Sequence, residues 1–197
     1  MSKRVLVVYC HPYSDSLVGA ARDRVLAGLA AAGHDLRQID LYGEGFDPAF
    51  SAWERAHHHD PPDTKPAIAA HVEALRWCER LVLVYPTWWS AQPAMLKGWI
   101  DRVWVDGVAW RLPPGADRIE PLLRNIRTIT VVTTHGSSRI VNIAQGDAGR
   151  HLVRRSLRFL CSRTTRVKFL ALYGVDSRPA AARTAFLAKV ERHFARS

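Results

Sequence analysis

The chain has 197 residues, of which 48% are hydrophobic and 23% are charged, and its formal net charge is +10. These proportions are ordinary for one globular domain with a full core, so we expect a single domain over residues 1–197. No run approaches the roughly 18 apolar residues that a membrane span requires, and the first residues lead straight into a predicted strand. We therefore expect a cytoplasmic protein with no membrane insertion.

The positive charge lies in the last quarter of the sequence. Twelve bases follow Gly149 and only two acids oppose them, Asp176 and Glu191, while the rest of the chain has sixteen of each sign. A solvated basic face on the terminal helices explains this excess, and a patch that attracts an anionic substrate is the alternative. We expect no nucleic-acid binding, because no recognised binding motif or interleaved aromatic pattern accompanies the charges.

The cysteines Cys10, Cys78 and Cys161 are an odd number and lack the spacing of metal ligands. No disulfide framework is implied by this count. We expect reduced, partly buried thiols.

The first elements alternate between strand and helix. A valine-rich apolar run at 4–10 predicts a strand buried on both faces. Residues 14–32 predict a helix with an N-cap among Ser14, Asp15 and Ser16, and residues 34–42 predict a second strand. From 43 to 66 the sequence is rich in Gly, Pro, His and Asp, which indicates a long loop. Loops of this length in compact domains usually serve a function.

The same alternation continues to the end of the chain. Pro93 fits the first turn of a helix, where its missing N–H costs nothing. The predicted helices are 65–77, 93–103, 147–161 and 178–194, and the predicted strands are 80–85, 127–134 and 165–175. Strands separated by helices indicate a parallel sheet with right-handed crossovers. We therefore predict an α/β fold, a doubly wound three-layer α/β/α sandwich with a five-stranded parallel sheet of order 2-1-3-4-5.

Three chemically distinct loops follow the first, third and fourth strands, and this fold brings them to one edge. The first, "CHPYSDSLVGA", offers His11, Ser14 and Ser16 before a helix N-terminus, which favours a phosphate. The second, "YPTWWSAQP", offers an apolar wall. The third, "TTHGSSR", offers hydroxyls, a histidine and a glycine that permits close backbone approach. Together they predict a flavin pocket.

The segments "HPYSDSL", "YPTWWSAQPAMLKGWIDRVW" and "TTHGSS" resemble the flavodoxin-like NAD(P)H:quinone oxidoreductases, which include modulators of drug activity and ancillary proteins of potassium efflux. The resemblance runs from Val5 to about Gly149 and is most specific from Pro86 to Val103. It implies that three loops hold the flavin. The implied flavin-binding residues are His11, Ser16, Leu17, Val18, Pro86, Thr87, Trp88, Trp89, Thr133, Thr134, His135 and Gly136.

This chain departs from the family pattern at several of these positions. The family usually has Asn where this chain has Val18, so one polar contact to the flavin is missing. Mammalian members carry a Tyr and a His that relay charge in hydride transfer, and the matching positions here are Val141 and Gln145. That relay therefore does not transfer. His135 replaces a glycine and is our candidate catalytic residue, as a substitute donor near the flavin; a solvated loop histidine is the alternative.

The resemblance implies an enzyme that passes hydride from NADPH or NADH through FAD, with FMN as the alternative, to quinones or similar electrophiles. It also implies a homodimer whose subunits cover each other's flavin. Arg139 is a candidate for contacting the 2′-phosphate of NADPH. The alternatives are a flavin-binding regulatory subunit of an ion-efflux system, and a flavodoxin-like electron carrier.

Other features of the sequence invite functional interpretations that we do not adopt. Consecutive histidines in "HHHD", 57–60, suit a metal poorly, and we expect no metal site. Asp101 and Arg102 are expected to form a surface or interface pair. Trp104 and Trp110 belong to the core or, by resemblance, to the cover of the partner's flavin.

Overall fold

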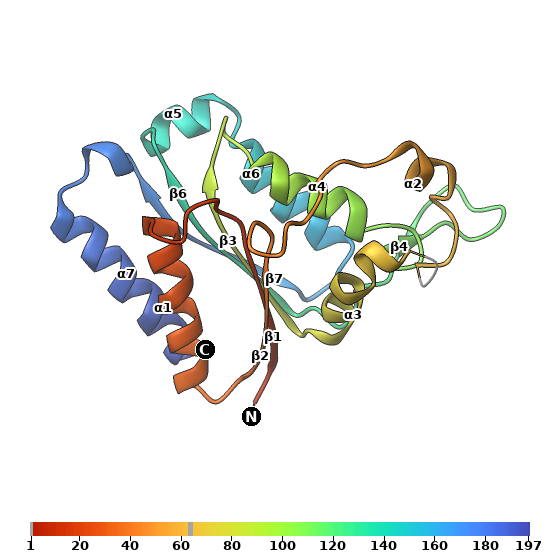
Figure 1. Ribbon diagram of the computed structural model, residues 1–197, viewed down its shortest axis with the longest axis horizontal. Coiled ribbons are helices and arrows are strands. Elements are labelled where there is room, and N and C mark those ends of the chain that lie inside the picture. The colour runs from red at the N-terminus through yellow and green to blue at the C-terminus, as the bar shows by residue number, and fades with distance from the viewer. Residues whose placement is uncertain (1, 63–64) are drawn as a thin grey trace.

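The computed structural model of the protein describes residues 2–62 and 65–197 and consists of a central sheet between two layers of helices (Figure 1). All strand pairs in this sheet are parallel, and its order is β2-β1-β3-β6-β7. The strands are β1 (Arg4–Tyr9), β2 (Asp35–Asp40), β3 (Arg80–Thr87), β6 (Thr128–His135) and β7 (Arg166–Tyr173). The predicted order 2-1-3-4-5 is confirmed, with β6 and β7 as the fourth and fifth strands.

Helices cover both faces of the sheet (Figure 1). On the first face lie α1 (Leu17–Ala31) and α7 (Ala180–Ala195). On the second face lie α3 (Ala69–Trp77), α4 (Ala94–Val103) and α6 (Ala148–His151), the last continuing into a π-helical segment at Leu152–Leu157. The right-handed crossovers expected for parallel strands account for helices on both faces.

The three inner strands, β1, β3 and β6, are buried on both faces because alternate residues enter two separate cores. In β1, Val5 and Val7 pack under α1 and α7, whereas Leu6 and Val8 pack under the helices of the opposite face. The predicted cysteine thiols are also in this interior, since all three are buried and free. Burial raises the pKa of each cysteine thiol to about 12, so the thiols are protonated at neutral pH.

The long segment after β2 contains one short helix, α2 (Ala52–Ala56). Ser51 and Glu54 form a capping box at its start, a signal present in the sequence "SAWE". The 3-10 turn Pro66–Ile68 then leads into α3, where the sequence predicts one continuous helix.

The expected surface pair of Asp101 and Arg102 is wrong. Asp101 instead bonds Lys97 one helical turn earlier, with 2.7 Å between Nζ and Oδ1. Arg102 is buried and pairs with the buried Glu54, with 2.7 Å between Nε and Oε1, and its guanidinium also donates to the carbonyl of Asp47. Residues four apart face each other on a helix, whereas neighbours do not. The buried pair therefore fastens α2 to α4.

Several features of the fold were not predicted. A helix, α5 (Arg139–Ala144), follows β6, and a two-stranded ribbon joins β4 (Trp110–Arg111) to β5 (Glu120–Pro121). Among the described residues, no helix is long and apolar enough to cross a membrane. Nor does any group of three or more His, Cys, Asp or Glu side chains in that part of the chain suit a metal ion.

Candidate active site

A tight turn after β3 presents an indole to solvent. Trp88 and Ala91 exchange two backbone hydrogen bonds, of 3.1 and 3.0 Å, so the turn has Trp89 and Ser90 at its centre. Both central residues have positive φ, 48° and 59°, as a type I′ turn requires. Residues other than Gly, Asn or Asp rarely adopt this conformation, and the strain costs about 1–2 kcal/mol per residue. The Trp89 side chain is nevertheless fully exposed.

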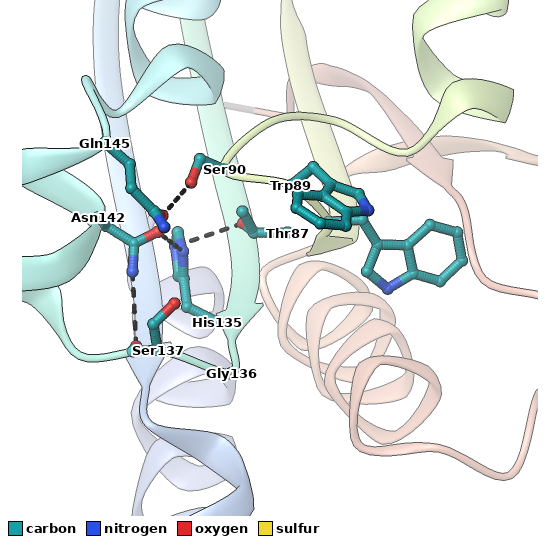
Figure 2. Close-up of a pocket in the computed structure, with 9 residues that line it drawn as sticks. Thr87, Trp89, Ser90, His135, Gly136, Ser137, Asn142 and Gln145 are labelled. Atoms are coloured by element: carbon teal, nitrogen blue, oxygen red, sulfur yellow. Dashed lines mark hydrogen bonds between the residues drawn. The ribbon is translucent and has the colours of Figure 1, made fainter.

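Across the pocket from this turn, His135 ends β6 in a hydrogen-bonded cluster (Figure 2). Its Nδ1 lies 2.8 Å from Oδ1 of Asn142, its Nε2 lies 3.4 Å from the hydroxyl of Thr87, and its ring stacks on Tyr173 with 4.3 Å between centroids. The Thr87 hydroxyl also bonds that of Thr133 at 3.0 Å. His135 is buried, so the alternative of a solvated histidine is wrong.

The hydrogen bonds of Asn142 fix the tautomer of His135. Asn142 Nδ2 donates to the carbonyl of Ser138 at 2.8 Å, so its Oδ1 must accept from the imidazole. Nδ1 of His135 therefore carries the proton, and Nε2 is left to accept from Thr87. Burial lowers the pKa of His135, an effect that the hydrogen bond to Asn142 only partly offsets. The ring is therefore neutral at pH 7.

We expect the free energy of unfolding to fall as the pH drops from 7 to 5. Burial lowers the pKa of four histidines in the folded state: His58, His71, His135 and His193. Below the unfolded value of about 6.5 the unfolded chain binds more protons, so stability that is complete above this pH is lost below it. Urea unfolding at three pH values measures the slope. The double variant His71→Gln, His135→Asn should flatten it, and an unchanged slope would contradict the prediction.

The loop after β1 forms the third side of the site. Ser16 is the N-cap of α1, because its hydroxyl accepts from the backbone N–H of Gly19 at 3.0 Å and donates to the carbonyl of Tyr13 at 2.9 Å. Its hydroxyl is thus already occupied. The backbone N–H groups of Leu17 and Val18, by contrast, have no acceptor among the described residues. These two amides suit an anion at the helix N-terminus.

Of the other residues predicted to hold the flavin, some lie near the site and some are buried in the core or in the sheet. The imidazole of His11 lies 6.4 Å from the Trp88 ring, which brings the loops after β1 and β3 together. The Val18 side chain, in contrast, is on the buried side of α1 and packs in the core between this helix and the sheet. Pro86 and Thr134 are buried register partners inside β3 and β6.

The turn, the cluster and Gly136 enclose a pocket of about 660 Å³ at the carboxyl edge of the sheet. This volume lies in the range of roughly 300–1,000 Å³ typical of sites for organic ligands. Of the predicted site residues, five line it, and four further residues were not expected there. The predicted ones are Thr87, Trp88, Trp89, His135 and Gly136, and the additional ones are Ser90, Ser137, Asn142 and Gln145.

In the third loop, the backbone N–H groups that a ligand can use come after His135, which is later in the chain than the resemblance implies. Residues 133–135 belong to β6, and His135 is paired with Thr87 on one side and Tyr173 on the other. Their backbone N–H groups therefore take part in the hydrogen bonds of the sheet. The N–H groups of Gly136 and Ser137 have no acceptor in the described part of the chain and are the donors available to a ligand.

Of the two positions that match the family's relay residues, only one lies at the pocket. Gln145 lines the pocket and accepts a hydrogen bond from the Ser90 hydroxyl (Figure 2). Val141 is 42% exposed on α5 and does not line the pocket. Neither side chain titrates, so a relay through these positions does not operate here.

We expect Trp89→Gly to leave the protein as stable or to raise its free energy of unfolding by up to about 1 kcal/mol, because glycine adopts positive φ without strain. The same change removes the exposed indole and should weaken binding of a planar ligand by about fivefold, since an aromatic contact contributes about 1 kcal/mol. Urea unfolding and ligand titration measure the two effects. Ser90→Gly relieves similar strain but keeps the indole, so it should retain affinity. A destabilised Trp89→Gly with full affinity would contradict this account.

Comparison with known proteins agrees with this geometry. A family model described as a flavodoxin-like fold matches residues 3–194, and the chain belongs to this family. The uncharacterized NAD(P)H oxidoreductase YcaK of Escherichia coli is 34% identical over 116 residues, which are 55% of this chain and 56% of that protein. NAD(P)H dehydrogenase [quinone] 1 of Rattus norvegicus is 26% identical over 165 residues, 75% of this chain and 58% of that protein.

Structural likeness extends over the whole chain. The crystal structure of Smu.1420 from Streptococcus mutans has a TM-score of 0.85 and 26% identity, covering 98% of this chain and 99% of that one. The matches to these two curated relatives span slightly more than half of the relatives' own length. Two further solved structures, each 15% identical to this chain, are described as complexes with FMN, and they share the fold alone.

Proposed function

We propose that the protein is a flavin-dependent NAD(P)H oxidoreductase that reduces quinones or similar electrophiles. The observation that carries this proposal is the pocket itself. An exposed indole, held in a strained turn, faces a neutral polar cluster beside backbone amides that have no acceptor. The names of the relatives from Escherichia coli and Rattus norvegicus support the same chemistry.

The residues present fit a flavin at three points. The free amides of Leu17 and Val18 suit its phosphate, the Trp89 indole offers a surface for the planar ring, and the amides of Gly136 and Ser137 suit its polar edge. When bound, the flavin supplies hydride transfer between the nicotinamide and the acceptor. FAD and FMN share the ring and the first phosphate, so both satisfy these contacts.

The protein's own part in the reaction is orientation and electrostatics. Amides aimed at a group that gains negative charge stabilise it without moving. Burial keeps His135 neutral, and Thr87 and Asn142 hold its ring in one tautomer at the wall of the pocket. A direct catalytic role for His135 stays a prediction, as do the contact of Arg139 with NADPH and the cytoplasmic location.

The absorption spectrum of the purified protein tests the proposal. We expect a bound flavin, recognised by its visible bands, and chromatography after denaturation identifies it as FMN or FAD. Colourless protein that takes up neither added flavin would refute the assignment. A flavin that NADPH and NADH fail to reduce would instead favour the regulatory or electron-carrier alternatives.

We also propose a homodimer whose second subunit closes the pocket. Trp104 lies in the chain's own core, as does the neighbouring Trp99, so neither is available to cover a partner's flavin. The supporting observation is an apolar rim beside the pocket, formed by Tyr13, Trp89 and the exposed face of α5. Patches of this kind mark interaction surfaces.

We expect a dimer by sedimentation at micromolar concentration. The double variant Ile140→Asp, Ile143→Asp should dissociate it, because both side chains are exposed on α5, at 80% and 58%, and charge in an apolar interface is costly. Leu112→Asp, on the β4–β5 ribbon, is the matched control. A wild-type monomer with full activity would contradict the proposal.

A further inference from the structure

A second cavity lies at the opposite end of the sheet from the candidate active site. Its volume is about 210 Å³, and it opens beneath the last turn of α7, near the ends of the chain marked N and C in Figure 1. Its polar lining comes from β3, β6, β7 and α7. The residues concerned are Arg80, Thr128, Thr130, Arg166, Lys168 and His193.

The sheet register places these side chains in two rows on one face. Arg80, Thr128 and Arg166 are register partners across three adjacent strands, and Thr130 and Lys168 are partners two residues further on. Adjacent strands are about 4.8 Å apart, so the backbones of the two arginines lie about 10 Å apart. In this row, Thr128 therefore lies on the strand between the two strands that carry the arginines.

These cations have no carboxylate partner among the described residues. The carboxylates nearest along the chain pair with other arginines. Oε2 of Glu79 lies 3.8 Å from Nε of Arg4, and Oε2 of Glu191 lies 2.8 Å from Nη1 of Arg24. Ser197 also lines the cavity, and its carbonyl oxygen bonds His34 at 3.1 Å. Like charges facing one another across strands destabilise a sheet. The fold therefore keeps a local excess of positive charge here.

The hydrogen bond of His193 adds a donor to this cluster. Lys168 Nζ lies 3.1 Å from Nδ1 of His193 and, as an ammonium, can only donate to it. The ring proton consequently lies on Nε2. Burial, followed by the charges of Lys168 and Arg80, lowers the pKa of His193, which keeps the imidazole neutral at pH 7.

We propose that this cavity binds a small tetrahedral oxyanion, a phosphate group, between Arg80 and Arg166. Guanidinium groups bind phosphate oxygens through paired, charge-assisted hydrogen bonds, and the threonine hydroxyls and Lys168 supply further donors. The cavity is smaller than the roughly 300–1,000 Å³ of sites for larger organic ligands. This site takes the phosphate alone or a small phosphomonoester, and it is independent of the proposed flavin site.

Calorimetry and thermal unfolding of the flavin-loaded protein test the site. Inorganic phosphate, titrated at constant ionic strength against sodium chloride, should bind saturably and raise Tm. Glycerol 3-phosphate forms the second arm: binding of both ligands shows an open site for phosphate groups, and binding of inorganic phosphate alone shows a closed one. Binding of neither ligand overturns the proposal.

Substitutions separate this cavity from other anion sites. In the double variant Arg80→Gln with Arg166→Gln, the Kd for phosphate should rise about tenfold or more, because charge-assisted hydrogen bonds are lost. Tm without phosphate should not fall, since like charges are removed. The control Lys189→Gln removes an exposed charge of α7 outside the cavity and should leave the Kd unchanged. The single variant Arg166→Gln, at an exposed position, serves if the double variant fails to fold. Wild-type affinity in the arginine variants overturns the proposal.

Discussion

Replacing Glu54 with alanine is expected to lower the free energy of unfolding by about 3–5 kcal/mol, the cost of leaving one member of a buried ion pair without its partner. Glu54 and Arg102 are both buried and lie 2.7 Å apart. Burial alone would raise the pKa of Glu54, but hydrogen bonds from Ser51 and Arg102 outweigh it, so the pKa is lowered and the carboxylate is charged. This loss would be a large part of the free energy of unfolding, which is typically about 5–15 kcal/mol.

A second pair of variants separates charge from packing. Replacing both members, as Glu54→Leu with Arg102→Met, should recover most of the loss, because an apolar pair leaves no buried charge. Glu54→Gln keeps the shape and should fall between the two. Urea unfolding measures all three. A loss below about 1 kcal/mol for Glu54→Ala would show that the pair is solvated and that α2 is not fastened to α4 by it.

Gly19→Ala is expected to weaken flavin binding by about a hundredfold. A Cβ at this position would lie 1.9 Å from the carbonyl oxygen of Ser14, so the loop between β1 and α1 must move. The amides of Leu17 and Val18 would move with it. Losing two hydrogen bonds to a charged group costs about 3 kcal/mol, which is about a hundredfold in affinity.

The same helix supplies the control for this substitution. At Gly28 a Cβ would lie 2.7 Å from the carbonyl oxygen of Glu191 in α7, so Gly28→Ala also overpacks the backbone. It lies far along α1 from the loop. We expect both variants to be destabilised, and only Gly19→Ala to lose flavin affinity in fluorescence titrations. Equal affinities would show that the loop does not hold the phosphate.

The strand order could be predicted because each strand of this sheet carries its own signal. The valine-rich run of β1 and the apolar start of β3 have no helical period, and the helices between them begin at recognisable caps such as Ser16. The helix α5 was missed because "RIVNIA" is short and apolar on its exposed side, although Ser138 caps it. The exposed apolar side chains of α5 are explained by a covering surface, such as the second subunit of the proposed dimer.

Parts of the site depend on contacts between residues distant in sequence. Asn142 and Gln145 reach the pocket only because α5 folds back over the end of β6. The burial of His135 follows from its stacking on Tyr173, which lies at the end of β7. Similarly, Arg102 is read from sequence as a surface charge, because its partner Glu54 is 48 residues away. Local patterns carry no information about such pairs.

One anaerobic experiment tests the central claim, that a nicotinamide and a quinone exchange two electrons through a flavin at this pocket. One equivalent of NADPH or NADH should bleach the visible bands of the bound flavin, and one equivalent of a benzoquinone should restore them. Steady-state rates at several concentrations of both substrates should then give parallel double-reciprocal lines, the pattern of two substrates that use one site in turn. A flavin that the nicotinamide reduces but no quinone reoxidises would contradict the account.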